Sequence, residues 1–184
     1  MKSRIEGPLR LDKGLFDIFL SAPEDPLPGF QAASSALKGR GKDHPRYGRW
    51  IYSLVRFYRP ETVVEVGTNA GGTAVGTARA LAENKNGRLI CVDNGEGVPR
   101  VFPEVARRNI ILAGLAENRF ELICADSKAA IPALASRLKG KVGVYIVDAA
   151  HTFEAALADI ENGLPMVKPG GYMAWVSTKS STSR

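Results

Sequence analysis

The sequence alternates between two kinds of segment from residue 61 onward, and this alternation limits the possible folds more than any other feature. Apolar runs of strand length are each followed by a longer segment with helical periodicity. We expect strands at residues 61–67, 87–93, 119–126, 141–148 and 170–177. We expect the intervening helices at residues 71–84, 103–117, 127–138 and 152–167.

The expected strands are continuous apolar runs, a pattern typical of strands that are buried on both faces of a parallel sheet. Repeated strand–helix units with right-handed crossovers predict an α/β fold, a doubly wound and mostly parallel Rossmann-like sheet. One further helix is expected before the first strand, because Trp50, Ile51, Leu54, Val55 and Tyr58 fall on one helical face ahead of Pro60.

Composition and charge narrow the class of protein. The chain has 184 residues and lacks an apolar run of 18 or more, and its N-terminus has no apolar signal core, so we expect a cytoplasmic protein without a membrane span. Cys91 and Cys124 both fall in expected strands and are interpreted as buried, reduced thiols.

Most of the net charge of +6 lies in residues 1–60, which contain 11 Lys and Arg against 6 Asp and Glu. A solvated lead-in is the favoured interpretation, because these charges are scattered among Pro, Gly and acids. An anion-attracting cover or a nucleic-acid face is the alternative. We expect an irregular segment or lid at 1–45, one domain at 46–176 and a disordered tail at 177–184.

Four successive strands end at or next to an acid: Glu65, Asp93, Asp126 and Asp148. An Asp at one strand end commonly caps the next helix, which is the alternative for each position taken alone. Ligands of open parallel sheets bind outside the carboxyl ends of the strands, so four acids on that one edge indicate a ligand site.

The loop after the first strand, "VVEVGTNAGG", has the spacing E-x-G-x-x-x-G-G, with glycines at Gly67, Gly71 and Gly72. It matches neither the dinucleotide fingerprint G-x-G-x-x-G nor the P-loop, which needs a Gly-Lys-Ser/Thr ending. The loop favours close approach to a nucleoside that carries an uncharged or zwitterionic attachment.

These motifs together resemble the class I S-adenosylmethionine-dependent methyltransferases, from about Pro45 to Val176. "VVEVGTNAGG", "LICVDNGEG" and "ELICADSKAAIPAL" are similar to the first three family motifs in order. "VDAAHTFEAALADI" followed by "VKPGG" is similar to a small-molecule O-methyltransferase branch with a D-x-x-H-x-[FY]-E pattern.

The resemblance implies S-adenosylmethionine as cofactor and a role for each motif residue. Gly67 and Gly71 would admit the methionine part, and Glu65 would orient the loop or meet the cofactor's amino group. Asp93 would accept hydrogen bonds from both ribose hydroxyls. Asp126, with Ser127 beside it, would meet the adenine amino group. Asp148 would lie near the transferred methyl group.

His151 and Asp148 are the candidate catalytic residues, because a hydroxyl acceptor needs a base and His151 is the imidazole next to Asp148. The alternative is that His151 only leads into the next helix. Some relatives bind a divalent cation, but no Asp or Glu follows Glu161, so we expect no metal.

The usual family sheet has seven strands in the order 3-2-1-4-5-7-6, and the motifs here account for five. We therefore expect a sheet without the strand 6/7 hairpin and an exposed edge at strand five. Residues 1–60 could compensate for the hairpin, or a second copy could cover the edge as a homodimer. Methyl transfer to a small molecule, at a hydroxyl oxygen, is the first interpretation. The alternatives are a degenerate cofactor-binding or assembly subunit and, ranked lowest, an RNA methyltransferase.

Overall fold

The computed structural model describes residues 44–96, 101–149 and 152–176. A five-stranded, wholly parallel sheet forms its centre, in the order β3-β2-β1-β4-β5. The strands are β1 (Thr62–Val66), β2 (Arg88–Asp93), β3 (Phe120–Cys124), β4 (Val142–Val147) and β5 (Val167–Trp175). The predicted fold class and strand order are therefore confirmed.

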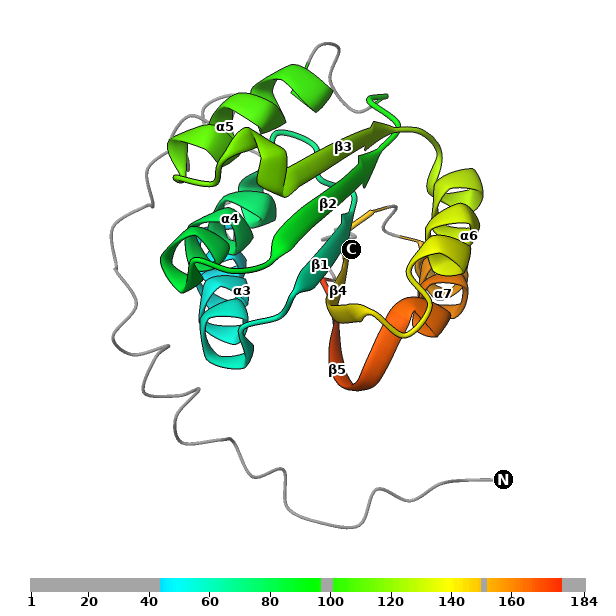
Figure 1. Cartoon of the computed structure of the whole chain (residues 1–184). Coiled ribbons are helices and arrows are strands. Elements are labelled where there is room, and N and C mark those ends of the chain that lie inside the picture. The colour runs from blue at the N-terminus through cyan, green and yellow to red at the C-terminus, as the bar shows by residue number, and fades with distance from the viewer. Residues whose placement is uncertain (1–43, 97–100, 150–151, 177–184) are drawn as a thin grey trace, which may run out of the picture.

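Helices cover the sheet on both faces, as Figure 1 shows. One layer contains α3 (His44–Tyr58), α4 (Gly72–Asn84) and α5 (Ala106–Leu112). The other contains α6 (Ser127–Arg137) and α7 (Phe153–Gly163), and the short helix η3 (Leu164–Met166) follows α7. Two apolar cores result, one on each side of the sheet, and each is built from alternate residues of the same strands.

Burial follows position in the sheet. The strands β1 and β4 are buried along their whole length, and β2 is buried except at its two ends, as continuous apolar runs predict. The outer strands β3 and β5 are only partly buried, because each has a neighbour on one side within the described chain. The expected burial of Cys124 is therefore wrong: it lies exposed at the end of β3, whereas Cys91 is buried in β2.

Two helices differ from the sequence expectation. The segment expected as one helix at 103–117 forms only α5. A kinked segment, η1 (Val101–Val105), with Phe102 in an extended conformation precedes it, and the 3-10 turn η2 (Glu117–Arg119) follows. On α3, Ile51, Leu54 and Val55 are buried as predicted, but Trp50 is 37% exposed. Packing on α4 selects a helix face that includes the buried Tyr52 and leaves Trp50 at its margin.

Polar contacts hold α3 on α4. The Tyr52 hydroxyl donates to Glu83 over 2.6 Å, and the Asn84 amide donates to the backbone oxygen of Val55 over 2.9 Å. Arg56 bonds to Asn84 and pairs with Glu83. Helix α3 is thus part of the packed domain. The segment predicted as a possible lid ahead of it, residues 1–43, lies outside the described ranges.

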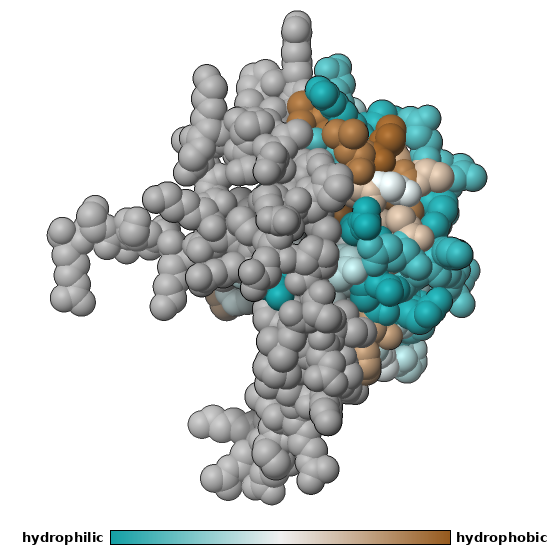
Figure 2. Space-filling model, turned by 90° about the vertical axis from the view of Figure 1, so that its left-hand side faces the viewer, coloured by the Kyte–Doolittle hydropathy of each residue, from teal (hydrophilic) through white to brown (hydrophobic). Residues whose placement is uncertain are grey.

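The surface on the α3–α5 side is mainly hydrophilic where it is described, with a hydrophobic patch near the top of the view in Figure 2. On α5, Ile111 and Leu112 are 43% and 48% exposed. Within the described ranges, no helix combines the length and apolarity that a bilayer crossing requires. The cytoplasmic location expected from the sequence stays a prediction.

The contact of α3 with α4 depends on Gly76, where an added Cβ would meet the Gly48 backbone oxygen at 2.3 Å. A Gly→Ala change inside a helix usually stabilises it by about 1 kcal/mol. At Gly76 the same change should instead lower the free energy of unfolding by roughly 1–3 kcal/mol, because backbone fills the space. Urea unfolding of Gly76→Ala measures the sign, and a stabilised variant would contradict this packing.

Candidate functional site

A cavity of about 530 Å³ opens at the carboxyl edge of the sheet. Because all strands are parallel, the loops after β1, β2, β3 and β4 meet there. Five of the predicted site residues line this cavity: Gly67, Asp93, Asp126, Ser127 and Asp148. The fold thus brings together residues that lie 81 positions apart in the sequence, from Gly67 to Asp148.

Asp93, at the end of β2, holds two loops together. Its Oδ2 accepts from the backbone N–H of Asn69 over 2.8 Å, and its Oδ1 accepts from the backbone N–H of Gly95 over 2.7 Å. Each carboxylate oxygen can accept a second hydrogen bond. The carboxylate is therefore fixed in orientation and keeps one acceptor site on each oxygen for a pair of neighbouring hydroxyls.

Asp126 and Ser127 begin α6. Asp126 is the N-cap, and its Oδ1 accepts from the backbone N–H of Lys128 over 2.8 Å. The capping role considered for a lone strand-end acid is therefore present at this position, and Asp126 also lines the cavity. Asp126 is exposed, so its second oxygen is accessible to a ligand.

Asp148 follows β4 and has its carboxylate at the cavity wall. The Thr73 hydroxyl, in the first turn of α4, donates to its Oδ2 over 3.2 Å. Burial raises the pKa of Asp148 to about 7, and the Thr73 hydrogen bond opposes this rise. A carboxylate with such a pKa can accept a proton near neutral pH.

Glu65 lies beneath the cavity, fully buried in β1. Neither of its carboxylate oxygens has a hydrogen-bond partner in the described parts of the chain. Burial raises its pKa well above the ordinary value, and the charges of Asp148 and Asp93 add to this effect. These surroundings favour the protonated form of Glu65. Glu65 is not among the residues that line the cavity.

Glycine is required at Gly67 and at Gly71 for different structural reasons. Gly67 has a φ of +85°, and a Cβ there would lie 2.1 Å from the backbone oxygen of Asp148. The close approach of β1 to the end of β4 therefore requires glycine, whether or not a ligand is bound. Gly71 also has a positive φ, +88°, immediately before α4, but it does not line the cavity.

His151 lies outside the described residues, so its predicted catalytic role is untested. Across residues 44–96, 101–149 and 152–176, no three His, Cys, Asp or Glu side chains gather where they could hold a metal ion. The expectation of a metal-free site stays a prediction.

Asp159 is a cavity residue that the sequence did not reveal. It lies on α7, is 3% exposed, and faces the same cavity as Asp126 and Ser127. Burial raises its pKa, the Ser127 hydrogen bond lowers it, and the charge of Asp126 raises it further. The available signal was an acid within the largely apolar segment "AALADI", but an Asp on a helix surface gives the same pattern.

The cavity lining is strongly acidic. Asp93, Glu96, Asp126, Asp148 and Asp159 all line it, and Lys128 is the one basic residue among the described lining residues. Such a lining attracts ligands that carry positive charge or several hydrogen-bond donors.

The raised pKa of Asp148 predicts a stability change. Its folded-state pKa of about 7 exceeds the ordinary 3.8, so only the folded state keeps this proton between those values. The free energy of unfolding therefore falls as pH rises through that window. Asp148→Asn should be more stable than the parent by roughly 1–3 kcal/mol at pH 8, and little different at pH 4.

Thermal unfolding at both pH values measures this difference. Glu96→Gln is the matched control, since Glu96 is an exposed acid of the same cavity and should give a much smaller effect. An Asp148→Asn variant that is less stable than the parent at pH 8 would contradict the conclusion that burial destabilises the ionised Asp148 carboxylate.

The fold and the acids together define a class of protein: an α/β domain with an acid-lined cavity at the carboxyl edge of its parallel sheet, where such folds bind their ligands. The model of a methyltransferase domain family matches residues 64–176, which is more than half of the chain. The chain belongs to this methyltransferase domain family. No curated protein matches the sequence.

Solved structures carry the same fold at low sequence identity. The O-methyltransferase from Bacillus cereus in complex with SAH has 20% identity and a TM-score of 0.64, with 90% of this chain and 66% of that chain covered. The O-methyltransferase TomG from Streptomyces achromogenes, in complex with SAM and involved in tomaymycin synthesis, has 22% identity and a TM-score of 0.67 over 89% and 70%.

A methyltransferase from Geobacter sulfurreducens has 20% identity and a TM-score of 0.62, with 90% of this chain and 81% of that chain covered. At such identities the likeness establishes the fold alone. The chain spans about two thirds of the length of the Bacillus cereus enzyme.

Proposed function

We propose that this protein uses S-adenosylmethionine to methylate a small molecule at a hydroxyl oxygen. One observation carries the proposal: the ends of β3, β2 and β4 place Asp126, Asp93 and Asp148 around one cavity, in that order across the sheet. Hydrogen-bond acceptors in this order match the donors of a nucleoside, from base to ribose, with a further acid beyond them. The family membership supports the same activity.

The donor set fits the cofactor at each of these positions. Asp93 keeps one acceptor site on each oxygen, which suits the two vicinal ribose hydroxyls. Asp126, assisted by Ser127, would accept from the adenine amino group. Gly67 would border the methionine part, whereas Gly71 does not line the cavity and would act only through the turn before α4. The SAM and SAH bound in the two O-methyltransferases described above support this assignment.

When bound, S-adenosylmethionine supplies a methyl group that is already activated by a positively charged sulfur. The protein then has to align the acceptor oxygen and remove its proton. Asp148 would accept that proton, directly or with His151 as the neighbouring base. Its pKa of about 7 suits proton transfer at neutral pH.

The alternative from another class is a degenerate domain that binds the cofactor without transfer or serves as an assembly subunit. An RNA substrate ranks lowest, because the cavity lining is acidic and would repel phosphates. Binding and turnover distinguish these alternatives, since they depend on different residues.

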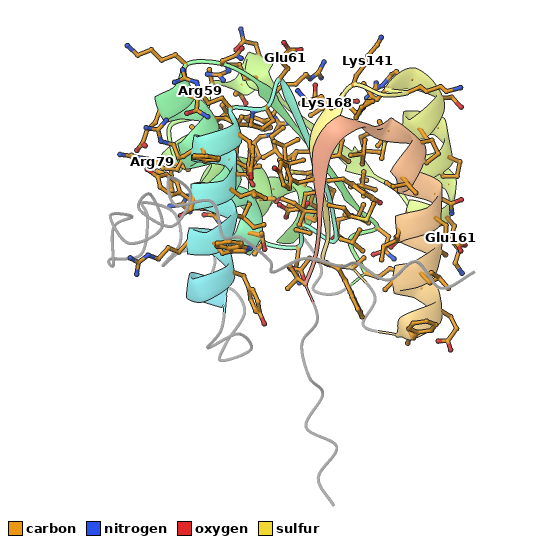
Figure 3. The ribbon with its side chains drawn as sticks, turned by 90° about the horizontal axis from the view of Figure 1, so that it is seen from below. Arg59, Glu61, Arg79, Lys141, Glu161 and Lys168 are labelled. Atoms are coloured by element: carbon orange, nitrogen blue, oxygen red, sulfur yellow. The ribbon has the colours of Figure 1, made fainter. Side chains whose placement is uncertain are left out.

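Calorimetric titration with S-adenosylmethionine tests the binding step. Asp93→Ala should weaken binding by roughly tenfold or more, because two charge-assisted hydrogen bonds to the ribose are lost. Glu61→Ala is the control, since Glu61 lies beside Lys141 and Lys168 at the edge of the domain shown at the top of Figure 3, before β1 begins.

No binding by the parent would refute the proposed function. Binding without methyl transfer to any member of a panel of phenols, sugars and hydroxylated metabolites would favour the degenerate domain. If the Asp93→Ala variant and the parent bind S-adenosylmethionine with equal affinity, Asp93 does not bind the cofactor.

We also propose that a second copy of this chain covers the outer edge of β5. This strand pairs only with β4 in the described structure, so its other edge presents unpaired backbone groups. Trp175 at its end is 53% exposed. Light scattering at rising concentration should show a dimer, and a clean monomer at high concentration would contradict the pairing.

A further inference from the structure

We propose that Asp148 makes the cavity selective for the cationic S-adenosylmethionine over its neutral product S-adenosylhomocysteine, and that its carboxyl group releases a proton when the cation binds. The inference rests on the proposed function. It assigns Asp148 a role in cofactor exchange, separate from any role in accepting a proton from the substrate.

The order of the strands places Asp148 at the sulfur end of the cofactor. Asp126 follows β3 and Asp93 follows β2, and these two acids are assigned to adenine and ribose. Neighbouring strands lie about 4.8 Å apart, so the groups beyond the ribose extend over the ends of β1 and β4. Asp148 is the acid of the cavity lining at the end of β4.

Asp148 has no counter-charge of its own in the described structure. The one printed partner of its carboxylate is the neutral Thr73 hydroxyl, on Oδ2. None of the ion pairs found among the described side chains, those of residues 47–96, 102–149 and 152–176, involves Asp148. Lys128, the one basic side chain of the described lining, does not pair with Asp148 either, so a bound cation would compensate the Asp148 charge.

The other acids near Asp148 supply no positive charge that could compensate its carboxylate. Glu65 on β1 lies close enough for its pKa to respond to the Asp148 charge, and burial raises the pKa of its own carboxyl group. The remaining charged side chains of the same cavity are Asp93 on β2, Glu96 after it, Asp126 and Lys128 at α6, and Asp159 on α7. Lys128 is the one basic side chain among them, and the others carry negative charge when ionised.

Proton release follows from these surroundings. Without a ligand the pKa of Asp148 is about 7, so about half of the molecules hold this proton at pH 7. A neighbouring positive sulfur favours the ionised carboxylate and lowers the pKa, whereas a neutral thioether has no such effect. The amino and carboxylate groups are common to both ligands and cancel in the comparison.

This arrangement has a consequence for turnover. Before transfer, the ionised carboxylate and the positive sulfur attract one another. After transfer the sulfur is neutral, the attraction is lost, and a carboxyl group that has taken up the acceptor's proton is neutral too. Asp148 would thus favour entry of the cofactor and exit of the product.

Calorimetric titration of the parent protein with each ligand, in buffers of different ionisation enthalpy at pH 7, counts the protons released. We expect about half a proton more for S-adenosylmethionine than for S-adenosylhomocysteine. The preference for the cationic ligand should also grow roughly tenfold between pH 6 and pH 8. These measurements on the parent do not depend on the folding of a variant.

Asp148→Asn should abolish both the proton difference and the pH dependence of the preference, whereas Glu96→Gln, an exposed acid of the same cavity, should keep both. Equal proton release for the two ligands in the parent, or an unchanged difference in Asp148→Asn, would overturn the inference while leaving the proposed function intact. Failure of both ligands to bind the parent would instead refute the proposed function.

Discussion

The parallel pairing of β1 with β2 and β4 is the constraint on which the rest of the structure depends. Its hydrogen bonds continue past the strand ends: Gly67 donates to Val92, Asp148 donates to Val66 and Ala125 donates to Asp93. These backbone bonds, each 2.8–3.0 Å long, hold the starting points of the three loops in register. The backbone pairing of the sheet thus fixes where the loops begin at the carboxyl edge, and the cavity lies between these loops.

This construction has an electrostatic cost. Strand ends that converge bring Glu65 and Asp148 together, α7 adds Asp159 to the same edge, and burial raises the pKa of all three. An apolar side chain at these positions would stabilise the folded state more. Strain of this kind is typical of sites that bind a charged partner, because the ligand supplies the charge that the protein lacks. Gly67 contributes to this crowding, since the absence of a side chain allows the ends of β1 and β4 to approach closely.

Much of the fold could be predicted because its signals are local. Strand-length apolar runs and helical periodicity identified all five strands and the helix before β1, and parallel order followed from the βα rhythm. The errors arose where tertiary packing overrides local pattern. Trp50 fits the apolar face of α3 by spacing, yet the packing against α4 includes Tyr52 in the buried face and leaves Trp50 at its margin. Cys124 fits a buried strand, yet β3 lies at an edge of the sheet and leaves it exposed.

The sequence by itself determined which residues end the strands, since Glu65, Asp93, Asp126 and Asp148 can be read directly after their apolar runs. Only the tertiary structure decided what each acid does there. Asp93 joins two loops, Asp126 caps a helix, Asp148 faces the cavity and Glu65 is sealed beneath it. The physical reason is that a carboxylate's role depends on its burial and its neighbours, and those come from strands and helices that are distant in sequence.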